Sequence, residues 1–387
     1  MTAVPPSAPP GVGEAERVAR AALSRVFEPG DPRQTVLVAE LGAEALCAHL
    51  LAEADLAGVR TDYGARLAAT DGAQELERAA RRGIRFVVPG DPEWPPGLDD
   101  LYGVAPVQDR GGPPVGLWVR GPVGLHELAG GVAVVGSRSA SEYGAAVAGD
   151  IAAEVAGAGL PVVSGAAFGI DRAAHVGAVN AEGRTAAVLA CGVDRAYPRE
   201  HARLLGHLVD HGAVVSEAAP GCAPQRIRFL ARNRLIAALT GSTLVVEAAL
   251  RSGALSTANW ASRLQRTLLG VPGPVTSAPS AGVHQLIRSG AATLVTSGAE
   301  VLEAVGRPGE HLLEVPRAPE RARDRLTARQ RQVLDGLPVH GGARVDSIAV
   351  SAGMGVVEVR GSLDRLARAG LVERDATGWR LAAAGRD

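Results

Sequence analysis

The sequence contains no lysine: its 40 cationic side chains are all arginine, set against 41 acidic ones. The formal net charge of -1 excludes a uniformly basic nucleic-acid-binding protein, so any nucleic-acid site must be a local concentration of charge. The lack of lysine also excludes a P-loop, because the G-x-x-x-x-G-K-[ST] motif requires one. We attribute the excess of arginine to a GC-rich coding bias and infer no function from it.

Cysteine is also scarce. Cys47, Cys191 and Cys222 are too few and too scattered for a disulfide framework or a zinc site, and we expect them to be small buried hydrophobes in a reducing compartment. The opening residues, MTAVPPSAPPGVG, lack the basic and apolar regions of a signal peptide, and no apolar run is long enough to span a membrane. We therefore expect a soluble, cytoplasmic protein with no membrane partner, no metal and no cofactor.

The chain divides by pattern into five stretches. We expect residues 1–13, rich in Pro, Gly and Ala, to be a disordered tail. Residues 14–83 carry apolar residues at three- and four-residue spacing, which predicts a small helical, SAM-like domain. Residues 301–324 combine Pro, Gly and mixed charge and indicate a linker. Residues 325–387 predict three helices and a β-hairpin, the pattern of a winged-helix domain. The remaining stretch, residues 84–300, is the largest.

Residues 84–300 alternate short apolar runs with amphipathic helices. The runs are VAVV, PVVS, AAVLA, AVVS, TLVVEA and LLGVPG, preceded by IRFVV and VGLWVRG and followed by TLVTS near residue 295. Continuous apolar strands separated by helices indicate a parallel sheet that is covered on both faces. Because crossovers between parallel strands are right-handed, the pattern predicts an α/β fold with a Rossmann-like, doubly wound sheet.

Small and polar residues follow nearly every predicted strand. In open α/β sheets, ligands bind beyond the carboxyl ends of the strands, where all of these residues would meet. Glycine-rich loops there present backbone N–H groups to anions, and the helices that follow add their positive N-terminal ends. The pattern predicts a phosphate-binding rim. Its predicted members are Gly136, Ser137 and Arg138 after VAVV, Ser164, Gly165, Phe168 and Gly169 after PVV, and Arg251, Ser252, Gly253 and Thr257 after TLVVEAAL.

The densest positive charge lies in RIRFLARNR, which contributes Arg226, Arg228, Arg232, Asn233 and Arg234. Charge runs usually form a solvated helix face, but the flanks of this one are apolar, so part of it should face the crevice. Together with Arg138 and Arg251 it predicts a basic groove. Phe168, Tyr143 and Phe229 are candidate surfaces for base stacking, although core packing explains each of them equally well.

The motifs of other phosphate sites are missing. The turn GSRSASEYG lacks the G-x-G-x-x-G fingerprint of a dinucleotide site. Asp171 and His175, four residues apart, could form an acid/base pair with Glu217 or Glu247, which end predicted strands. No nucleophile or metal cluster accompanies them. We therefore expect Asp171 to cap its helix, His175 to pack beneath the loop, and the protein not to be an enzyme.

Seven blocks resemble, in order, the signature blocks of the DprA/Smf family of DNA-processing proteins, and PGDPEWPPGLDDL and PVGLWVRG before them resemble that family's lead-in, so that the match spans about residues 84–293. The seven blocks are VAVVGSRSASEYG, VVSGAAFGIDRAAH, GVDRAYP, SEAAPG, RFLARNRLIAALT, EAALRSGALSTANWA and VPGPVTSAPSAGVHQLIRSGA. The resemblance implies a homodimer that binds and protects incoming single-stranded DNA and loads the RecA recombinase onto it during natural transformation. The flanking domains resemble the three-domain version of the family more loosely.

The resemblance also assigns the family's motifs to positions of this chain. Its GSR turn falls on 136–138, its SGxAxGID loop on 164–171, its RNR element on 232–234 and its SG-x-x-x-TA block on 252–258. Two departures are apolar and concern local packing. Leu230-Ala231 follows Phe229 where the family commonly has Phe-Pro before the RNR element, and Ala166 stands where a leucine is usual.

Two other functions compete with this interpretation. Phosphoribohydrolase-like enzymes that process nucleotides share a related Rossmann-like fold, but they carry a PGGxGTxxE element, and the comparable VPGPVTSAPSAG has no glutamate. The winged helix could instead make the chain a sequence-specific repressor. Its predicted recognition helix offers Arg360, Arg365 and Arg368 but also Glu358 and Asp364, so we expect protein contacts or weak DNA binding there rather than specific readout.

Overall fold

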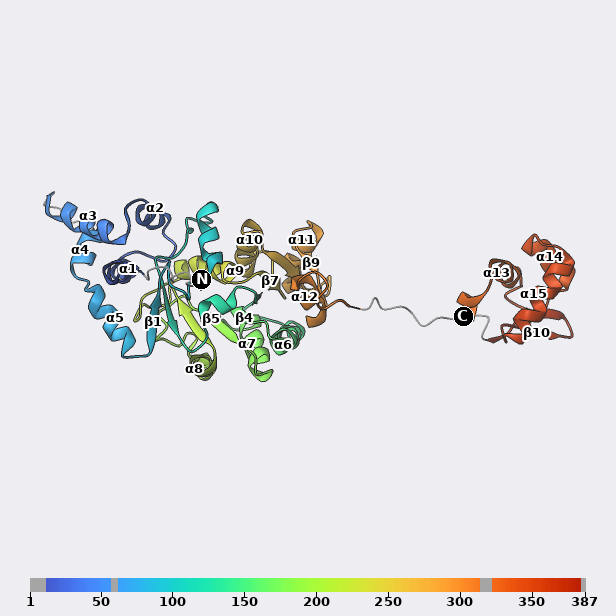
Figure 1. The fold of residues 1–387 in the computed structure, drawn as a ribbon. Coiled ribbons are helices and arrows are strands. Elements are labelled where there is room, and N and C mark those ends of the chain that lie inside the picture. Colours follow the sequence, from blue (N-terminus) through green and yellow to red (C-terminus); the bar gives the residue numbers. More distant parts are fainter. Residues whose placement is uncertain (1–11, 57–61, 314–321, 384–387) are drawn as a thin grey trace, which may run out of the picture. The chain divides into compact units, whose positions relative to one another are not determined.

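The computed structural model describes residues 12–56, 62–313 and 322–383 (Figure 1). Its contacts divide the chain into two compact units, Met1–Leu313 and Glu314–Asp387, and each is considered by itself. Most of the predicted N-terminal tail and residues 314–321 of the predicted linker lie outside the described residues.

A nine-stranded sheet forms the centre of the first unit, in the order β1-β2-β6-β5-β4-β3-β7-β8-β9. The seven strands from β6 to β9 are parallel to their neighbours, while β2 pairs antiparallel with β6 and β1 antiparallel with β2. Every predicted strand is present, and the predicted α/β class with a doubly wound, mostly parallel sheet is confirmed. The strands are β1 (Ile84–Val87), β2 (Leu117–Arg120), β3 (Val132–Val135), β4 (Val162–Ser164), β5 (Thr185–Val188), β6 (Ala213–Ser216), β7 (Ser242–Val245), β8 (Thr267–Gly270) and β9 (Thr293–Leu294).

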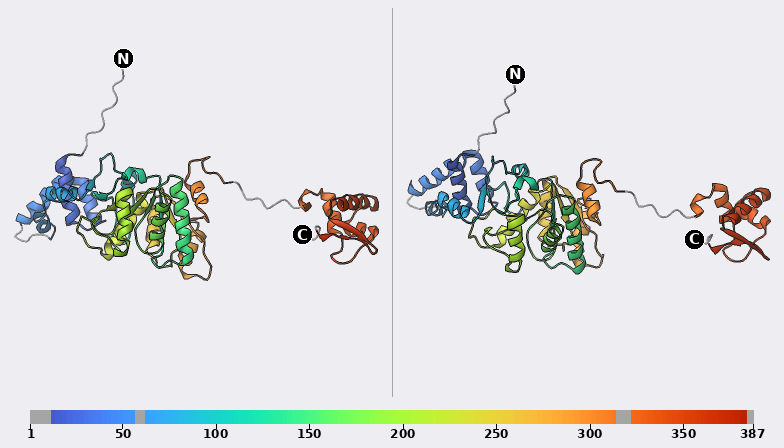
Figure 2. Two further views of the ribbon diagram at one scale, coloured as in Figure 1. Left: turned by 90° about the horizontal axis from the view of Figure 1, so that it is seen from below. Right: turned by 60° about the horizontal axis from the view of Figure 1, so that its bottom comes forward.

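Helices cover both faces of this sheet (Figures 1 and 2). One face carries α6 (Glu142–Gly157), α7 (Ile170–Asn180) and α8 (Ala202–His211), and the other carries α9 (Arg226–Ala238), α10 (Ala254–Arg263) and α11 (Ala281–Arg288). Because successive side chains of a strand point to opposite faces of the sheet, each strand packs against both helix layers. Val134 packs in the cluster with α6 and α7, whereas the next residue, Val135, packs in the cluster with α9 and α10.

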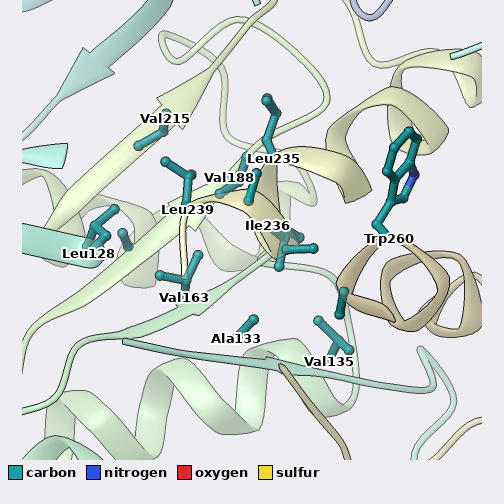
Figure 3. Close-up of a cluster of buried hydrophobic side chains, with 14 of the residues drawn as sticks. Leu128, Ala133, Val135, Val163, Val188, Val215, Leu235, Ile236, Leu239 and Trp260 are labelled. Atoms are coloured by element: carbon teal, nitrogen blue, oxygen red, sulfur yellow. The ribbon is translucent and has the colours of Figure 1, made fainter. Parts of the chain in front are cut away.

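Helix α9 is fixed to the sheet by its apolar residues. Leu235, Ile236 and Leu239 gather with the strand residues Val163 and Val188 in one buried cluster (Figure 3). Full burial of such side chains stabilises the fold by about 1.5–3 kcal/mol each. The orientation of α9, and therefore of the arginines that it carries, is set by this packing.

The N-terminal helices belong to the same unit as the sheet. Trp118 of β2 donates a hydrogen bond from Nε1 to Ser24 Oγ of α1 at 3.2 Å, and Figure 2 shows these helices beside the edge of the sheet that holds β1. Within the described residues, no individual helix is both long and apolar enough to cross a membrane; α2 and the start of α3 pass that test only as a sharply bent pair. The helices are α1 (Glu14–Val26), α2 (Pro32–Leu41), α3 (Ala43–Leu56), α4 (Asp62–Ala68) and α5 (Gly72–Ala80).

The sheet domain extends beyond residue 300, where its boundary was predicted. Residues of the expected linker form the end of α12 (Gly298–Val305), and Val301 is buried in the same cluster as Ile151 of α6. The sequence pattern missed this because a single turn of apolar residues, Val301 and Leu302, precedes the charged and Gly/Pro-rich stretch.

Short 3-10 helices are η1 (Pro96–Gly103), η2 (Leu125–Leu128), η3 (Arg199–His201), η4 (Ala278–Ser280) and, in the second unit, η5 (Ala322–Arg325).

The described residues of the second unit form three α-helices and a β-hairpin, besides η5. Its helices are α13 (Ala328–Asp335), α14 (Val345–Ala352) and α15 (Val356–Arg368), and its hairpin is β10 (Val372–Asp375) with β11 (Gly378–Leu381). A further bridge joins Ala343 to Trp379 beside the hairpin. Leu334, Ile348 and Leu363, one from each helix, are buried in a core of their own.

Candidate nucleic-acid interface

The strand order places a crevice between β3 and β7. The chain passes from β3 to β4 on one side and, after β6, returns to β7 on the other side of β3. Loops that leave β3 and β7 at their carboxyl ends therefore diverge to opposite faces of the sheet, and ligands of open α/β sheets bind at such a point. The GSR turn at 136–138 follows β3, and the segment 249–253 follows β7.

A cavity of about 1100 Å³ occupies this crevice. It brings Arg138, Arg232 and Arg251 to one surface, although they come from three separate elements. Tyr197 and Phe229 line it as well. Of the residues predicted for the rim and the basic groove, those that line the cavity are Gly136, Ser137, Arg138, Arg226, Arg232, Asn233, Arg251, Ser252, Gly253 and Thr257; those outside its lining are Ser164, Gly165, Phe168, Gly169, Arg228 and Arg234.

The turn after β3 is held by backbone contacts from both sides. Ser137 N donates to Glu247 O at 2.7 Å, and Ile170 N donates to Ser137 O at 3.2 Å. A Cβ on Gly169 would lie 2.2 Å from Ser137 O, and Gly169 has a φ of +74°. Glycine is therefore needed at 169 both for the conformation and for the close approach. Gly169 supports the turn after β3 rather than facing the cavity itself.

Phe229 lies at the centre of the aromatic and cationic groups of the cavity. The guanidinium of Arg138 lies 4.7 Å from the centroid of its ring, and that of Arg232 lies 5.9 Å from the same centroid. Cation–π attraction at these distances orients both arginines. The ring of Tyr197, which is 42% exposed, lies 5.8 Å from that of Phe229 at an interplanar angle of 56°. Sequence reasoning did not single out Tyr197, whose only signal was its place in the GVDRAYP block.

Arg232 forms the floor of the cavity and is only 6% exposed. Its Nη1 donates to Val188 O at 2.8 Å, and a Cβ on Gly165 would lie 1.6 Å from that nitrogen. Burial lowers the pKa of Arg232, while the nearby Asp171 opposes that shift, and arginine stays charged in proteins. Gly165 thus makes room for a buried positive charge beneath the cavity.

Asn233 also joins the two sides of the crevice. Its Nδ2 donates to Gly253 O at 3.3 Å, which connects α9 to the turn after β7. Arg251 of that turn is exposed and Ser252 half-buried, and Ser252 Oγ accepts a hydrogen bond from Ala254 N at 3.3 Å. The turn is therefore held on both sides, while the side chain of Arg251 remains at the open surface of the cavity.

Two of the arginines predicted to face DNA point into the protein instead. Arg234 is fully buried, its Nη1 and Nη2 each 2.8 Å from an oxygen of Glu217, and its Nε donates to Gly112 O. Arg228 donates to both carboxylate oxygens of Glu28 at 2.8 Å. Residues 232 and 234 lie about 200° apart around a helix, so only one of them can face the cavity. In this structure Arg228 and Arg234 hold the N-terminal helices against the sheet.

The remaining predicted residues lie near the cavity without lining it. Ser164 Oγ is buried and donates to Val134 O at 2.6 Å. Phe168 is 45% exposed, and its ring lies 4.8 Å from that of His201. Tyr143 donates its hydroxyl to Pro272 O at 2.6 Å. Phe168 therefore presents an exposed ring beyond the cavity rather than inside it.

The carboxylates considered as acid/base groups have structural partners. Glu247 accepts hydrogen bonds from the backbone N–H and the hydroxyl of Ser141, the N-cap of α6, and Glu217 is paired with Arg234. Asp171 accepts a hydrogen bond from Ala167 N at 3.3 Å, so it braces the preceding loop, whereas Gly169 is the N-cap of α7. The expectation that Asp171 caps its own helix is therefore wrong. Burial raises the pKa of Asp171, against the influence of Arg232.

His175 is buried and does not reach the cavity. Its Nδ1 lies 2.7 Å from Thr185 Oγ1, and burial lowers its pKa to about 3. A neutral, enclosed imidazole of this kind is a packing residue at neutral pH. Among the described residues, no group of three or more His, Cys, Asp or Glu side chains is arranged to hold a metal ion.

Comparison with known proteins identifies the family. The model of the family described as DNA recombination-mediator protein A matches residues 85–306. The chain is 44% identical over 374 residues to the putative DNA processing protein DprA of Mycobacterium tuberculosis, with 94% of each chain covered, and 42% identical over 209 residues to protein Smf of Escherichia coli, with 54% of each covered. The X-ray structure of DprA from Streptococcus pneumoniae aligns with a TM-score of 0.61 at 31% identity and covers 76% of this chain and 98% of that one. The chain therefore belongs to the DNA recombination-mediator protein A family, the DprA/Smf family.

Proposed function

We propose that the protein is a cytoplasmic recombination mediator that binds single-stranded DNA in the cavity between β3 and β7. In this role it protects incoming single strands and loads RecA onto them during natural transformation, as a homodimer and without catalysing a reaction. The observation that carries the proposal is the convergence of Arg138, Arg232 and Arg251 on one cavity. Membership of the family supports the roles in RecA loading and transformation.

The charge of the cavity favours a strand over a single nucleotide. Its volume of about 1100 Å³ lies at the upper limit of the roughly 300–1,000 Å³ of small-ligand pockets. Arginines bind phosphate oxygens in a planar, bidentate manner. Contacts of this kind fix a backbone without reading its sequence, so we expect binding that tolerates any sequence and weakens with salt.

The aromatic residues favour a single strand over a duplex. Tyr197 exposes part of its ring beside the arginines. Bases can stack on such a ring only where they are not already paired and stacked within a duplex. The cavity lining also includes the loop 136–139, the turn 251–253 and the first turn of α10.

Salt-dependent binding of a fluorescent oligothymidylate tests the proposal. For single strands, log K falls with log salt by about 0.7 per phosphate contact, so Arg138→Ala and Arg251→Ala should each lower that slope by about 0.7. The matched control is Arg184→Ala, an exposed arginine that precedes β5 at the opposite edge of the sheet and pairs with Glu127. If both cavity variants bind like the wild type at every salt concentration, the proposal fails.

RecA loading and dimerisation need their own measurements. RecA filament formation on strands coated by a single-strand-binding protein should be accelerated by the wild type and not by Arg138→Ala. Sedimentation velocity should give twice the monomer mass. If Arg138→Ala accelerates RecA filament formation as much as the wild type does, RecA loading does not depend on this cavity.

A phosphoribohydrolase-like enzyme is the second candidate, because nucleotides also bind at the switch point of doubly wound sheets. Against it, Glu217 and Glu247 are already engaged by Arg234 and Ser141. Incubation with nucleoside monophosphates distinguishes the two functions. If the wild type releases free base and Glu247→Gln does not, the protein is an enzyme rather than a binding protein.

A further inference from the structure

The turn formed by residues 107–110, between η1 and β2, contributes an uncharged polar side chain to the cavity. Val107 and Gln108 both line the cavity. Two backbone hydrogen bonds close the turn, because Val107 N donates to Arg110 O at 2.8 Å and Arg110 N donates to Val107 O at 3.0 Å. This is the pairing of a hairpin with a two-residue loop, and the loop residues are Gln108 and Asp109.

The 107–110 turn is anchored on both sides. Val107 packs against the buried cluster that contains Ile236 of α9. On the other side, Gly111 N donates to Gly30 O, in the connection between α1 and α2, at 3.0 Å. Two separate regions of the first unit therefore fix the turn, and Gln108 at its tip has a defined place beside the cavity.

Gln108 has a backbone conformation that glutamine rarely adopts. Its φ is +51°, and that of Asp109 is +57°. Hairpin loops with positive φ at both residues favour glycine, asparagine and aspartate. Aspartate therefore suits position 109, but the conformation gives no reason for glutamine at 108. Strained residues that the surrounding structure holds in place cluster at ligand-binding sites, so the side chain of Gln108 is the part to consider.

The side-chain amide of Gln108 has no partner within the described part of the chain, and the residue is exposed. Two other side-chain amides line the cavity, and both are engaged. Asn233 Nδ2 donates to Gly253 O at 3.3 Å, and Asn259 Oδ1 accepts from Arg263 Nε at 3.2 Å. Gln108 therefore presents to the cavity an amide whose donor and acceptor are both available.

A free amide at this place suits a base better than a phosphate. Phosphate oxygens only accept hydrogen bonds, whereas the Watson–Crick edge of each base has a donor beside an acceptor. A glutamine amide offers the complementary pair and can bind a base edge through both groups. The carboxylate of Asp109 is exposed next to Gln108 and disfavours a phosphate at the tip of the turn.

We propose that Gln108 hydrogen-bonds the Watson–Crick edge of an unpaired base when a strand lies in the cavity. In a duplex the complementary base occupies that edge, so the contact is available only to a single strand. Because the amide can rotate to exchange its donor and acceptor, the contact fits each of the four bases. This inference rests on the proposed function, since it requires the cavity to hold single-stranded DNA. It gives the cavity a contact that selects single strands without selecting a sequence.

Methylation of thymine at N3 tests the contact, because it removes the donor of the Watson–Crick edge and leaves the phosphates in place. The wild type should bind an oligothymidylate about two- to tenfold more tightly than the same strand with N3-methylthymine, the range for one hydrogen bond. Gln108→Met keeps the length of the side chain without its polar atoms and should bind both strands equally. Fluorescence anisotropy with labelled strands measures the four affinities.

Gln265→Met is the matched control. Gln265 is also an exposed glutamine with a positive φ, of +55°, but it lies between α10 and β8, outside the lining of the cavity. This variant should keep the full preference for the unmethylated strand. Thermal unfolding of Gln108→Met and Gln265→Met should match that of the wild type, since both side chains are exposed.

The inference is overturned if the wild type binds the two strands equally, or if Gln108→Met keeps the preference of the wild type. Weakening of both strands by the same factor in Gln108→Met would also contradict it, because Gln108 would then act on phosphates or on the shape of the turn. Arg138→Ala separates these results from the proposed function. It should weaken both strands and keep the preference between them; if it weakens neither, the proposed function fails first.

Discussion

Arg234 of α9 and Glu217 at the end of β6 form a buried ion pair with two hydrogen bonds of 2.8 Å, and their side chains are 0% and 7% exposed. Gly30 N, from the connection between α1 and α2, donates to Glu217 Oε1 at 3.1 Å. Arg234 Nε donates to Gly112 O at 2.8 Å. One ion pair thus joins the N-terminal helices, the sheet and the helix that carries Arg232, so the geometry of the cavity depends on it.

Removing one partner of this pair should destabilise the fold strongly. Glu217→Gln or Arg234→Met leaves the other charge buried without a counter-ion, which costs about 3–5 kcal/mol. Replacement of both, as Glu217→Gln/Arg234→Met, should cost less than the sum of the two single changes. Urea unfolding followed by circular dichroism gives the three free energies of unfolding.

The control is a pair of the same residue types at the surface. Arg81, the C-cap of α5, and Glu77 within α5 are 60% and 67% exposed, so Arg81→Met should change the free energy of unfolding by less than about 1 kcal/mol. A loss in Arg234→Met as small as that in Arg81→Met would mean that the buried pair contributes nothing beyond an ordinary surface contact.

Gly165→Ala should weaken DNA binding without changing any charge. The added Cβ would lie 1.6 Å from Arg232 Nη1 and 2.3 Å from its Cζ, so the guanidinium must leave the floor of the cavity. We expect an affinity close to that of Arg232→Ala and a salt slope lower by about 0.7. Fluorescence anisotropy with a labelled oligothymidylate measures both.

Gly253→Ala is the matched control for that substitution. Gly253 lines the same cavity, but a Cβ there meets no atom within 4 Å. It should bind DNA like the wild type. Equal weakening by Gly165→Ala and Gly253→Ala would show that the rim needs glycine for its backbone rather than space for Arg232.

The sequence was sufficient to predict the sheet and the place of the cavity, because both follow from short-range patterns. Apolar runs predict parallel strands, and the residues that follow them must meet at one edge. Ten of the residues predicted for the rim and the basic groove line the cavity, Arg138 and Arg251 among them. The partners of Arg228 and Arg234 could not be predicted in this way. Glu28 lies 200 residues before Arg228 in the chain, and no local pattern indicates that the two meet.

The sequence pattern also could not predict which residues of irregular segments line the cavity. Val107 and Gln108 line the cavity from a loop before β2 that has no periodicity, and Gln108 has a φ of +51°. Their position depends on the tertiary contacts of that loop, such as the hydrogen bond from Gly111 N to Gly30 O at 3.0 Å. Such contacts join residues that are far apart in the chain.

Tyr197→Ala should weaken binding only where bases are present. Stacking on an aromatic ring contributes about 1–3 kcal/mol per base, whereas an abasic strand offers phosphates alone. Comparison of a normal with an abasic oligonucleotide should therefore show a loss for Tyr197→Ala on the first and none on the second. Tyr197→Phe keeps the ring and should bind both strands as the wild type does. Tyr102→Ala, which removes a 55% exposed ring of η1, is the control. If Tyr197→Ala loses as much affinity on the abasic strand as on the normal strand, stacking is contradicted.

Glu28→Gln should make the stability of the protein less dependent on pH in the acid range. Hydrogen bonds from Arg228 hold the pKa of Glu28 below its ordinary value of 4.5, although burial opposes the shift. A carboxyl whose pKa is lower in the folded than in the unfolded state stabilises folding above the ordinary value, and this stabilisation disappears as the pH falls through the folded-state pKa. The side chain of Glu28 is 38% exposed, so Glu28→Gln should cost no more than about 1 kcal/mol at neutral pH. In urea unfolding, the difference in free energy of unfolding between Glu28→Gln and the wild type should shrink between about pH 5 and pH 3. If this difference stays constant over that range, the Arg228 contact is not its source.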